Sequence, residues 1–163
     1  MFHGIELVLI GTPTNYDLTT TTMTLDEANL LIQACVDTMS ARYGSTVFNE
    51  WAVLSLHEQS VHILKYSGPR KDDFQKNFAK DLDGLREDIE SREFGVGDFA
   101  FARHGVGTGF EAFMILGPGL YLICNNTRTS MDAITKDPRW LGAQVPFVEL
   151  SDKIRAHPLV PQT

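Results

Sequence analysis

Apolar residues recur every three or four positions from Leu25 to Tyr43, with polar residues between them. This spacing predicts an α-helix whose buried face is formed by Leu25, Ala28, Ile32, Cys35, Met39 and Tyr43. Thr24 and Glu27 have the spacing of a capping box, in which each side chain satisfies a backbone donor of the first turn. Gly44 follows the last turn, where a glycine readily takes the left-handed conformation that ends a helix.

A second helical pattern runs from about Asp72 to Ser91, and its apolar face carries Phe74, Phe78, Leu82, Leu85 and Ile89. The opposite face is largely charged, which is typical of solvated surface. Gly84 lies inside this helix and costs about 1 kcal/mol relative to alanine, unless a close neighbour needs the missing side chain.

Runs rich in β-formers predict strands at residues 1–10, 48–56, 61–67, 98–106, 109–116 and 120–126. The second and third runs read as a hairpin, and simple alternation puts His62, Leu64 and Tyr66 on one face of the third run. The last two runs meet at Gly117-Pro118-Gly119, a strong turn signal. Because both arms of this turn are apolar, we expect them to be inner strands of an antiparallel sheet covered by helices.

After Asn126 the pattern predicts a helix at residues 130–136, a break at Pro138 and a last short helix from about Pro146, followed by a loose tail at 157–163. The chain is therefore expected to be a single α+β domain, with a central antiparallel sheet of five to six strands and helices on its faces. Its order is (β)-α-β-β-α-β-β-β-α. The core spans about 25–136, with an N-terminal strand in 1–24 and a Pro-broken helical segment at 137–163 as additions.

Composition limits the classes of partner. Asp and Glu outnumber Lys and Arg by 21 to 14, a net charge of -7, so we expect no nucleic acid partner. The apolar run Ile5 to Ile10 is too short to span a membrane and lacks the flanks of a signal peptide, so we expect no membrane partner. Two cysteines without C-x-x-C spacing favour a reduced, cytoplasmic setting and buried free thiols.

Few residues suggest chemistry. His57 and His62 flank the hairpin turn with Glu58 between them, which permits a metal site there, but the four ligands of a structural zinc site are missing. Cys124 with a histidine is the one plausible nucleophilic pair. We predict no catalytic residue, no metal and no cofactor.

Two segments are candidate binding surfaces. The loop with Arg103, His104, Gly105 and Gly107 has closely spaced glycines that can offer backbone donors to an anion, although it lacks the G-K-[ST] of a phosphate loop. Arg139 and Trp140, in the sequence KDPRW, have the composition of a protein interface; alternatively, Trp140 packs back on the sheet and seals it.

The order of elements resembles the Roadblock family of dynein light chains and bacterial GTPase regulators, which has a profilin-like fold. The resemblance covers about Asp26 to Lys136 and rests on the glycine turn 117–119, on the alternating Phe99 and Phe101, and on NNTRTSMDAI before the last helix. It implies a homodimer in which the second helices pack together and the third strands of the core pair. The dimer contacts would then come from Phe78, Gly84, Leu85, Phe99 and Phe101.

The resemblance implies a non-catalytic platform for a small GTPase or a signalling complex. Longin domains and other profilin-like folds share much of the order. Two alternatives come from different classes of protein. One is a sensor domain with a ligand pocket between the sheet and the C-terminal helices; the other is a small enzyme that uses His57, His62 or Cys124. Fold likeness cannot decide among them, because functional sites are grafted onto folds.

Overall fold

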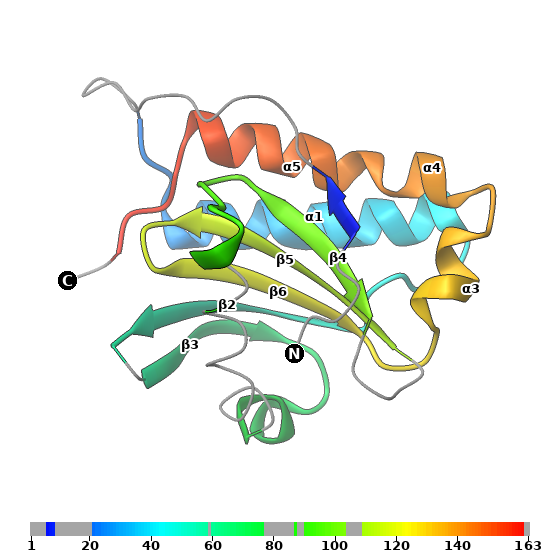
Figure 1. Ribbon diagram of the computed structural model, residues 1–163, viewed down its shortest axis with the longest axis horizontal. Helices are drawn as coiled ribbons and strands as arrows, with labels where there is room; N and C mark the ends of the chain where they lie inside the picture. The colour runs from blue at the N-terminus through cyan, green and yellow to red at the C-terminus, as the bar shows by residue number, and fades with distance from the viewer. Residues whose placement is uncertain are drawn as a thin grey trace.

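The computed structural model describes residues 6–8, 21–58, 60–76, 87, 90–103 and 109–161, which form an α+β domain around one antiparallel sheet (Figure 1). The sheet has six strands in the order β1-β4-β5-β6-β2-β3, and every neighbouring pair is antiparallel. The strands are β1 (Glu6–Val8), β2 (Glu50–His57), β3 (Ser60–Ser67), β4 (Phe99–Arg103), β5 (Phe110–Gly117) and β6 (Leu120–Asn126). The predicted fold class is confirmed at this level, and β5 and β6 are inner strands, as expected.

The helices are α1 (Leu25–Tyr43), α3 (Met131–Thr135), α4 (Trp140–Ala143) and α5 (Val145–Ala156). Helices α1, α4 and α5 contact one another on one face of the sheet (Figure 1). Residues 71–76, 87 and 90–91 are helical, as predicted for the second helix, and its residues 77–86 and 88–89 lie outside the described residues.

The C-terminal part has one helix more than the sequence predicts. Three helices follow β6: α3 and α5 correspond to the helices expected at residues 130–136 and from about Pro146, and α4 is additional. Pro138 cannot continue α3, and Pro146 stands in the first turn of α5, where its missing N–H costs nothing.

Helix α1 begins and ends where its local signals predict. The Thr24 N–H donates to Glu27 Oε2 at 2.8 Å, and the Glu27 N–H donates to Thr24 Oγ1 at 3.2 Å, so the capping box is formed. Gly44 has φ 91° and donates its N–H to the Ser40 carbonyl. Both expectations are confirmed. They could be predicted from the sequence because each depends on residues within about one turn of each other.

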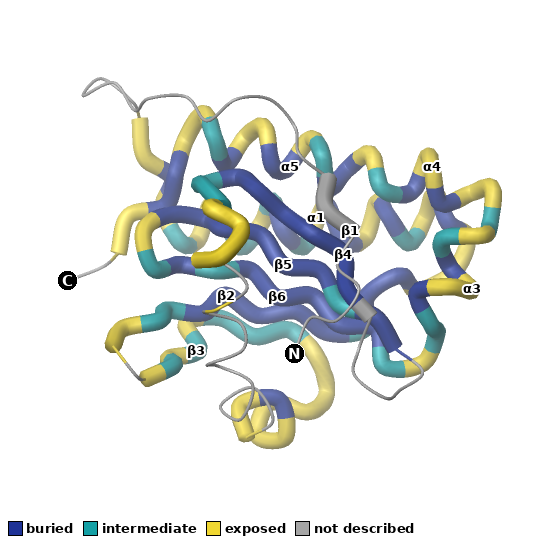
Figure 2. The backbone as a smooth tube through the Cα atoms, in the orientation of Figure 1, coloured by how far each residue is buried: buried dark blue, intermediate teal, exposed yellow. Residues whose placement is uncertain are grey.

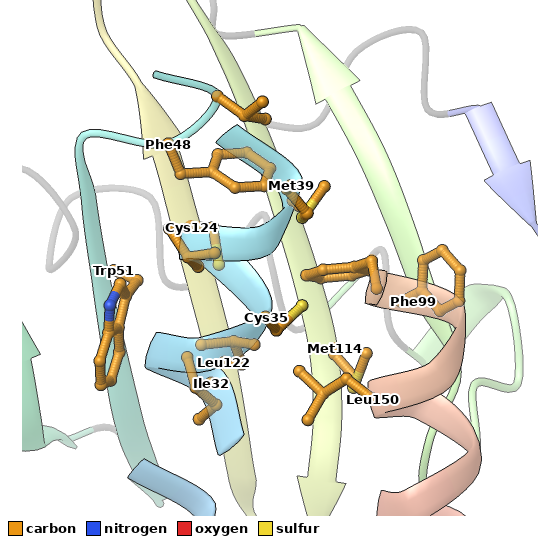
Figure 3. Close-up of a cluster of buried hydrophobic side chains, with 14 of the residues drawn as sticks. Ile32, Cys35, Met39, Phe48, Trp51, Phe99, Met114, Leu122, Cys124 and Leu150 are labelled. Atoms are coloured by element: carbon orange, nitrogen blue, oxygen red, sulfur yellow. The ribbon is translucent and has the colours of Figure 1, made fainter. Parts of the chain in front are cut away.

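The main hydrophobic core lies between the sheet and the helices α1, α4 and α5. Phe99 packs edge-to-face on Phe147 with ring centroids 5.0 Å apart, and Phe101 packs the same way on Trp140 at 5.2 Å. The backbone of β4, β5 and β6 is buried along most of its length, whereas β3 is partly exposed (Figure 2). Figure 3 shows side chains of α1, the sheet and α5 meeting in this layer.

The faces predicted for β3 are wrong beyond Leu64. The pairing register between β2 and β3 shifts between Val53 and Leu54, so that Lys65 and Ile63 pair with consecutive residues and Leu64 is the extra residue. Such a bulge reverses the alternation of the side chains that follow it. Tyr66 therefore lies on the same face of the sheet as Ile63, opposite to the face predicted for it, and both residues pack against a second apolar cluster there.

The predicted loose tail is also wrong, because residues 158–159 are held by Met23, which precedes α1, and by the end of β5. The Met23 N–H donates to the Pro158 carbonyl at 2.9 Å, and the Leu159 N–H donates to the Leu116 carbonyl at 2.9 Å. Leu159 is 2% exposed. A Cβ at Gly117 would lie 1.9 Å from the Leu159 carbonyl oxygen, so a glycine is needed where the tail crosses the turn.

Gly117→Ala is expected to destabilise the protein by about 2 kcal/mol or more, because the backbone at Leu159 has to move to admit the new methyl group. Gly142→Ala is the matched control, since a Cβ there meets nothing within 4 Å and alanine is the better helix former. Urea unfolding of both variants measures the difference. Equal stability of the two variants would contradict the tail contact.

Candidate functional site

The sheet has two edge strands, β1 and β3, which differ in length. On one edge β1 pairs with β4, with Glu6 opposite Phe101 and Val8 opposite Phe99. On the other edge β3 pairs with β2 alone among the described strands. An unpaired edge presents backbone donors and acceptors to another chain. Both outer strands have one neighbour among the described strands, but β1 has three residues and β3 has eight, so β3 offers the longer row of backbone groups to a further strand.

An apolar hollow adjoins this edge on the α1 side. Leu64, at the bulge, is 37% exposed, and Val160 of the tail is 53% exposed. They line a hollow of about 80 Å³ together with Leu25, Leu120 and Leu159. Lys65 lies 3.6 Å from Asp26 of α1 and places a charge beside it. We call Ser60–Ser67 together with this hollow the β3 edge surface.

A buried carboxylate joins the strands next to this surface. Glu50, at the start of β2, is 4% exposed and accepts the Tyr66 hydroxyl at 2.6 Å and Asn125 Nδ2 at 3.3 Å. Arg70 Nη2 lies 3.5 Å from Glu50 Oε1. Burial, and then the hydrogen bond to Glu50, raises the pKa of Tyr66 to about 12. The network fixes β3 and the segment after it to the centre of the sheet.

A glycine makes room for this network. A Cβ at Gly68 would lie 2.7 Å from both the Tyr66 hydroxyl oxygen and the Glu50 Cβ. Sequence reasoning missed the network, because its members come together only through the register of three strands. Glu50 by itself reads as one polar residue in a strand, and Gly68 reads as an ordinary turn glycine.

The residues considered for catalysis do not converge. His57 and His62 lie at the hairpin, opposite Ser60 and Ser55, and no group of three metal-binding side chains occurs in the part of the chain that the structure describes. Cys124 is opposite Trp51 in the middle of the sheet and is fully buried. The histidines and the thiol therefore lie on different parts of the sheet.

Both thiols are unsuited to act as nucleophiles. Burial raises the pKa of Cys124 well above its usual value, and burial raises the pKa of Cys35 to about 12. Figure 3 shows the two side chains within the apolar layer between α1 and the sheet. At neutral pH they are protonated, and only a thiolate is a competent nucleophile.

The residues expected at a dimer interface have other neighbours. Phe99 and Phe101 are 0% and 2% exposed, and their rings face α4 and α5 of the same chain. Phe78, Gly84 and Leu85 lie outside the described residues, as do His104, Gly105 and Gly107 of the glycine loop. The backbone of Arg103 ends β4, opposite Phe110.

Trp140 packs back onto the sheet, the second of the two alternatives for that residue. It is 6% exposed and contacts Phe101 and Phe110, so it seals the core at the end of the helical layer. Arg139 remains outside, 4.7 Å from the Tyr43 ring and 2.7 Å from Asp137 Oδ2. Its hydrogen bonds lower the pKa of Asp137 to about 2.

The layer in which a sensor domain would need its pocket is filled by side chains. Rings of Phe48, Phe99, Phe101, Phe110, Phe147 and Trp140 contact one another between the sheet and the C-terminal helices. The hollow beside Leu64 lies at the edge of the sheet instead.

Comparison with known proteins adds no assignment. No family model matches the chain, and no curated protein sequence matches it. Among the described helices, none has the length and apolar character needed to cross a membrane.

Tyr66→Phe is expected to lower the free energy of unfolding at pH 8 by about 1–2 kcal/mol, because Glu50 loses a short hydrogen bond. The pKa of Tyr66 is raised in the folded state, so its contribution is fully present below about pH 10 and is lost as the pH rises towards 12. The difference in urea stability between wild type and variant should therefore shrink over that range. A difference that stays constant would contradict the buried hydrogen bond.

The two thiols are expected to react slowly with an aromatic disulfide reagent at pH 8 in the native protein, and both should react at once in guanidinium. Burial and protonation both oppose the reaction in the native state. Absorbance of the released thiolate gives both rates. If Cys124 reacts in the native state as fast as in the denatured state, the argument against its nucleophilic role fails.

Proposed function

We propose that this protein is a non-catalytic interaction domain that forms a homodimer and serves as a platform for another protein, such as a small GTPase or a member of a signalling complex. The observation that carries the proposal is the asymmetry of the sheet edges, with the three-residue β1 at one edge and the eight-residue β3, beside an apolar hollow, at the other. A function of this kind needs a surface that accepts another chain, and the β3 edge surface has the required groups.

The β3 edge surface can bind an extended strand by backbone hydrogen bonds, with the hollow beside Leu64 accepting a side chain of the added strand. In the homodimer the added strand is β3 of the second copy. The bulge at Leu64 and the charge of Lys65 oppose longer pairing, since both features blunt an edge. Pairing is therefore centred on Ser60–Ile63, which favours a specific partner over open-ended aggregation.

This dimer differs from the arrangement that the Roadblock resemblance implies. In the Roadblock-like arrangement the third core strands of the two copies pair with each other, and β4 is the corresponding strand in this chain. Because β1 pairs with Phe99–Phe101 of β4, a second copy could pair there only after β1 had left. The Roadblock-like order of helix, two strands, helical segment and three strands supports the platform function, while the covered β4 edge moves the proposed contact to β3.

The positions of the reactive groups favour this function over an enzyme. Cys124 is buried in the core, whereas His57 and His62 are on the hairpin. The filled layer between sheet and helices likewise favours it over a sensor domain with an internal pocket.

Size-exclusion chromatography with light scattering should give a dimer mass that falls towards the monomer mass on dilution. Leu64→Asp is expected to raise the dissociation constant at least about tenfold, because it places a charge in the apolar hollow at the interface. Leu30→Asp is the matched control: it also replaces an exposed leucine, which is 73% exposed and lies on α1 outside the β3 edge surface.

A monomer mass for the wild type at every concentration would overturn the homodimer. A dimer that Leu64→Asp leaves intact would place the interface elsewhere than β3. A dimer weakened equally by both variants would also contradict the assignment, since Leu30 does not line the hollow at this edge.

A further inference from the structure

A groove runs between α1 and α5 on the outer side of the helical layer. The two helices are antiparallel: Arg42 Nη1, in the last turn of α1, donates to the Gly142 carbonyl just before α5, and Met23, just before α1, donates its N–H to Pro158, just after α5. Two hollows, of about 480 Å³ and 110 Å³, lie along this line, and Leu31 lines both of them. We call the continuous surface formed by Leu30, Leu31, Ala34, Thr38, Glu149 and Lys153 the α1/α5 groove.

Helix α1 carries a second stripe that its packing on the sheet does not use. Its core stripe is Ala28, Ile32, Cys35, Val36, Met39 and Tyr43, all buried. The second stripe recurs with the same helical spacing at Glu27, Leu30, Leu31, Ala34 and Thr38. Leu30 is 73% exposed, and the short side chains of Ala34 and Thr38 leave the groove open between the helices. This is the shape that receives the apolar ridge of another helix.

The charges beside the groove select a basic partner. Each helix contributes one glutamate to the lining of the two hollows, Glu27 from α1 and Glu149 from α5, and neither forms an ion pair with a cation in the described part of the chain. Lys153 is the one lysine or arginine that lines the two hollows. The whole chain has a net charge of -7, which also attracts a cationic segment.

We propose that the α1/α5 groove binds an amphipathic, basic α-helix of a partner protein. Leucine-like residues of that helix lie against Leu30, Leu31 and Ala34, and its lysines or arginines lie beside Glu27 and Glu149. Helix α5 has 12 residues, which at about 1.5 Å per residue gives a groove of about 18 Å and room for three turns of the docked helix. Recognition of this kind uses apolar anchors at i, i+3, i+4 and i+7.

The inference extends the proposed interaction function to a second surface, and the two can fail separately. The β3 edge surface binds through the backbone of an edge strand, and the groove binds through side chains of α1 and α5. Leu64 is therefore the test position for the β3 edge surface and the control position for the groove.

The test uses the full chain and three fluorescent 14-residue peptides. The first has leucines at helical spacing flanked by lysines, the second replaces the lysines by glutamates, and the third replaces the leucines by serines. Fluorescence anisotropy is expected to give a micromolar dissociation constant for the first peptide and values at least about tenfold higher for the other two. Ala34→Gln, which puts a longer polar side chain into the groove, and Glu149→Lys should each weaken the first peptide about tenfold.

Leu64→Asp is the control and should leave this dissociation constant unchanged. The proposal is overturned if the serine peptide binds as well as the leucine peptide, since charge alone would then explain binding. It is equally overturned if Ala34→Gln binds like wild type, or if the first peptide does not bind at about 1 mM. Light scattering of the same samples distinguishes the two proposals. If a monomer binds the peptide, the homodimer is overturned and the groove stands. If a dimer fails to bind the peptide, the groove is overturned and the homodimer stands.

Discussion

The edge-to-face packing of Phe99 and Phe101 on Phe147 and Trp140 is the interaction on which the rest of the architecture depends. It closes the layer between β4 and the C-terminal helices and buries four large rings, each of which contributes more than its area alone. Because these rings contact each other within one chain, none of them is left for a partner. The two proposed surfaces, at the sheet edge and on the outer side of the helices, do not use these rings.

The position of α5 over the start of β4 is fixed by polar contacts that only one arrangement satisfies. Arg155 Nη2 lies 2.8 Å from Asp98 Oδ1, and both side chains are nearly buried, at 12% and 10% exposure. Ser151 donates to the Gly97 carbonyl at 2.6 Å. A buried ion pair adds little net stability, but losing one partner is costly, so it specifies how the elements dock. The walls of the α1/α5 groove are consequently held at a set spacing, which is what a docked helix requires.

The sequence predicted features that depend on near neighbours and missed those that depend on register. The capping box of α1, the Gly44 end and the inner position of β5 and β6 followed from short-range signals. The faces of β3 after Leu64 did not, because a bulge is set by pairing with β2 and leaves no mark in the alternation.

The candidate surfaces show the same limit. Exposed Leu30 could be read as one apolar residue on a helix, but the groove exists only because α5 returns beside α1. The β3 edge surface likewise needs the tail, which reads as loose in sequence and is held by Met23 and Leu116. In both cases a segment distant in sequence forms one wall of the surface.

The tail also explains why the two proposed surfaces are separate although both border α1. Residues 157–161 follow α5, cross the turn between β5 and β6, and place Leu159 and Val160 beside Leu64. On the opposite side of the same segment, His157 lies 3.0 Å from the Thr21 carbonyl and closes the end of the groove. The segment thus separates the two proposed surfaces, so that a strand bound at the β3 edge surface and a helix bound in the α1/α5 groove would not compete for the same residues.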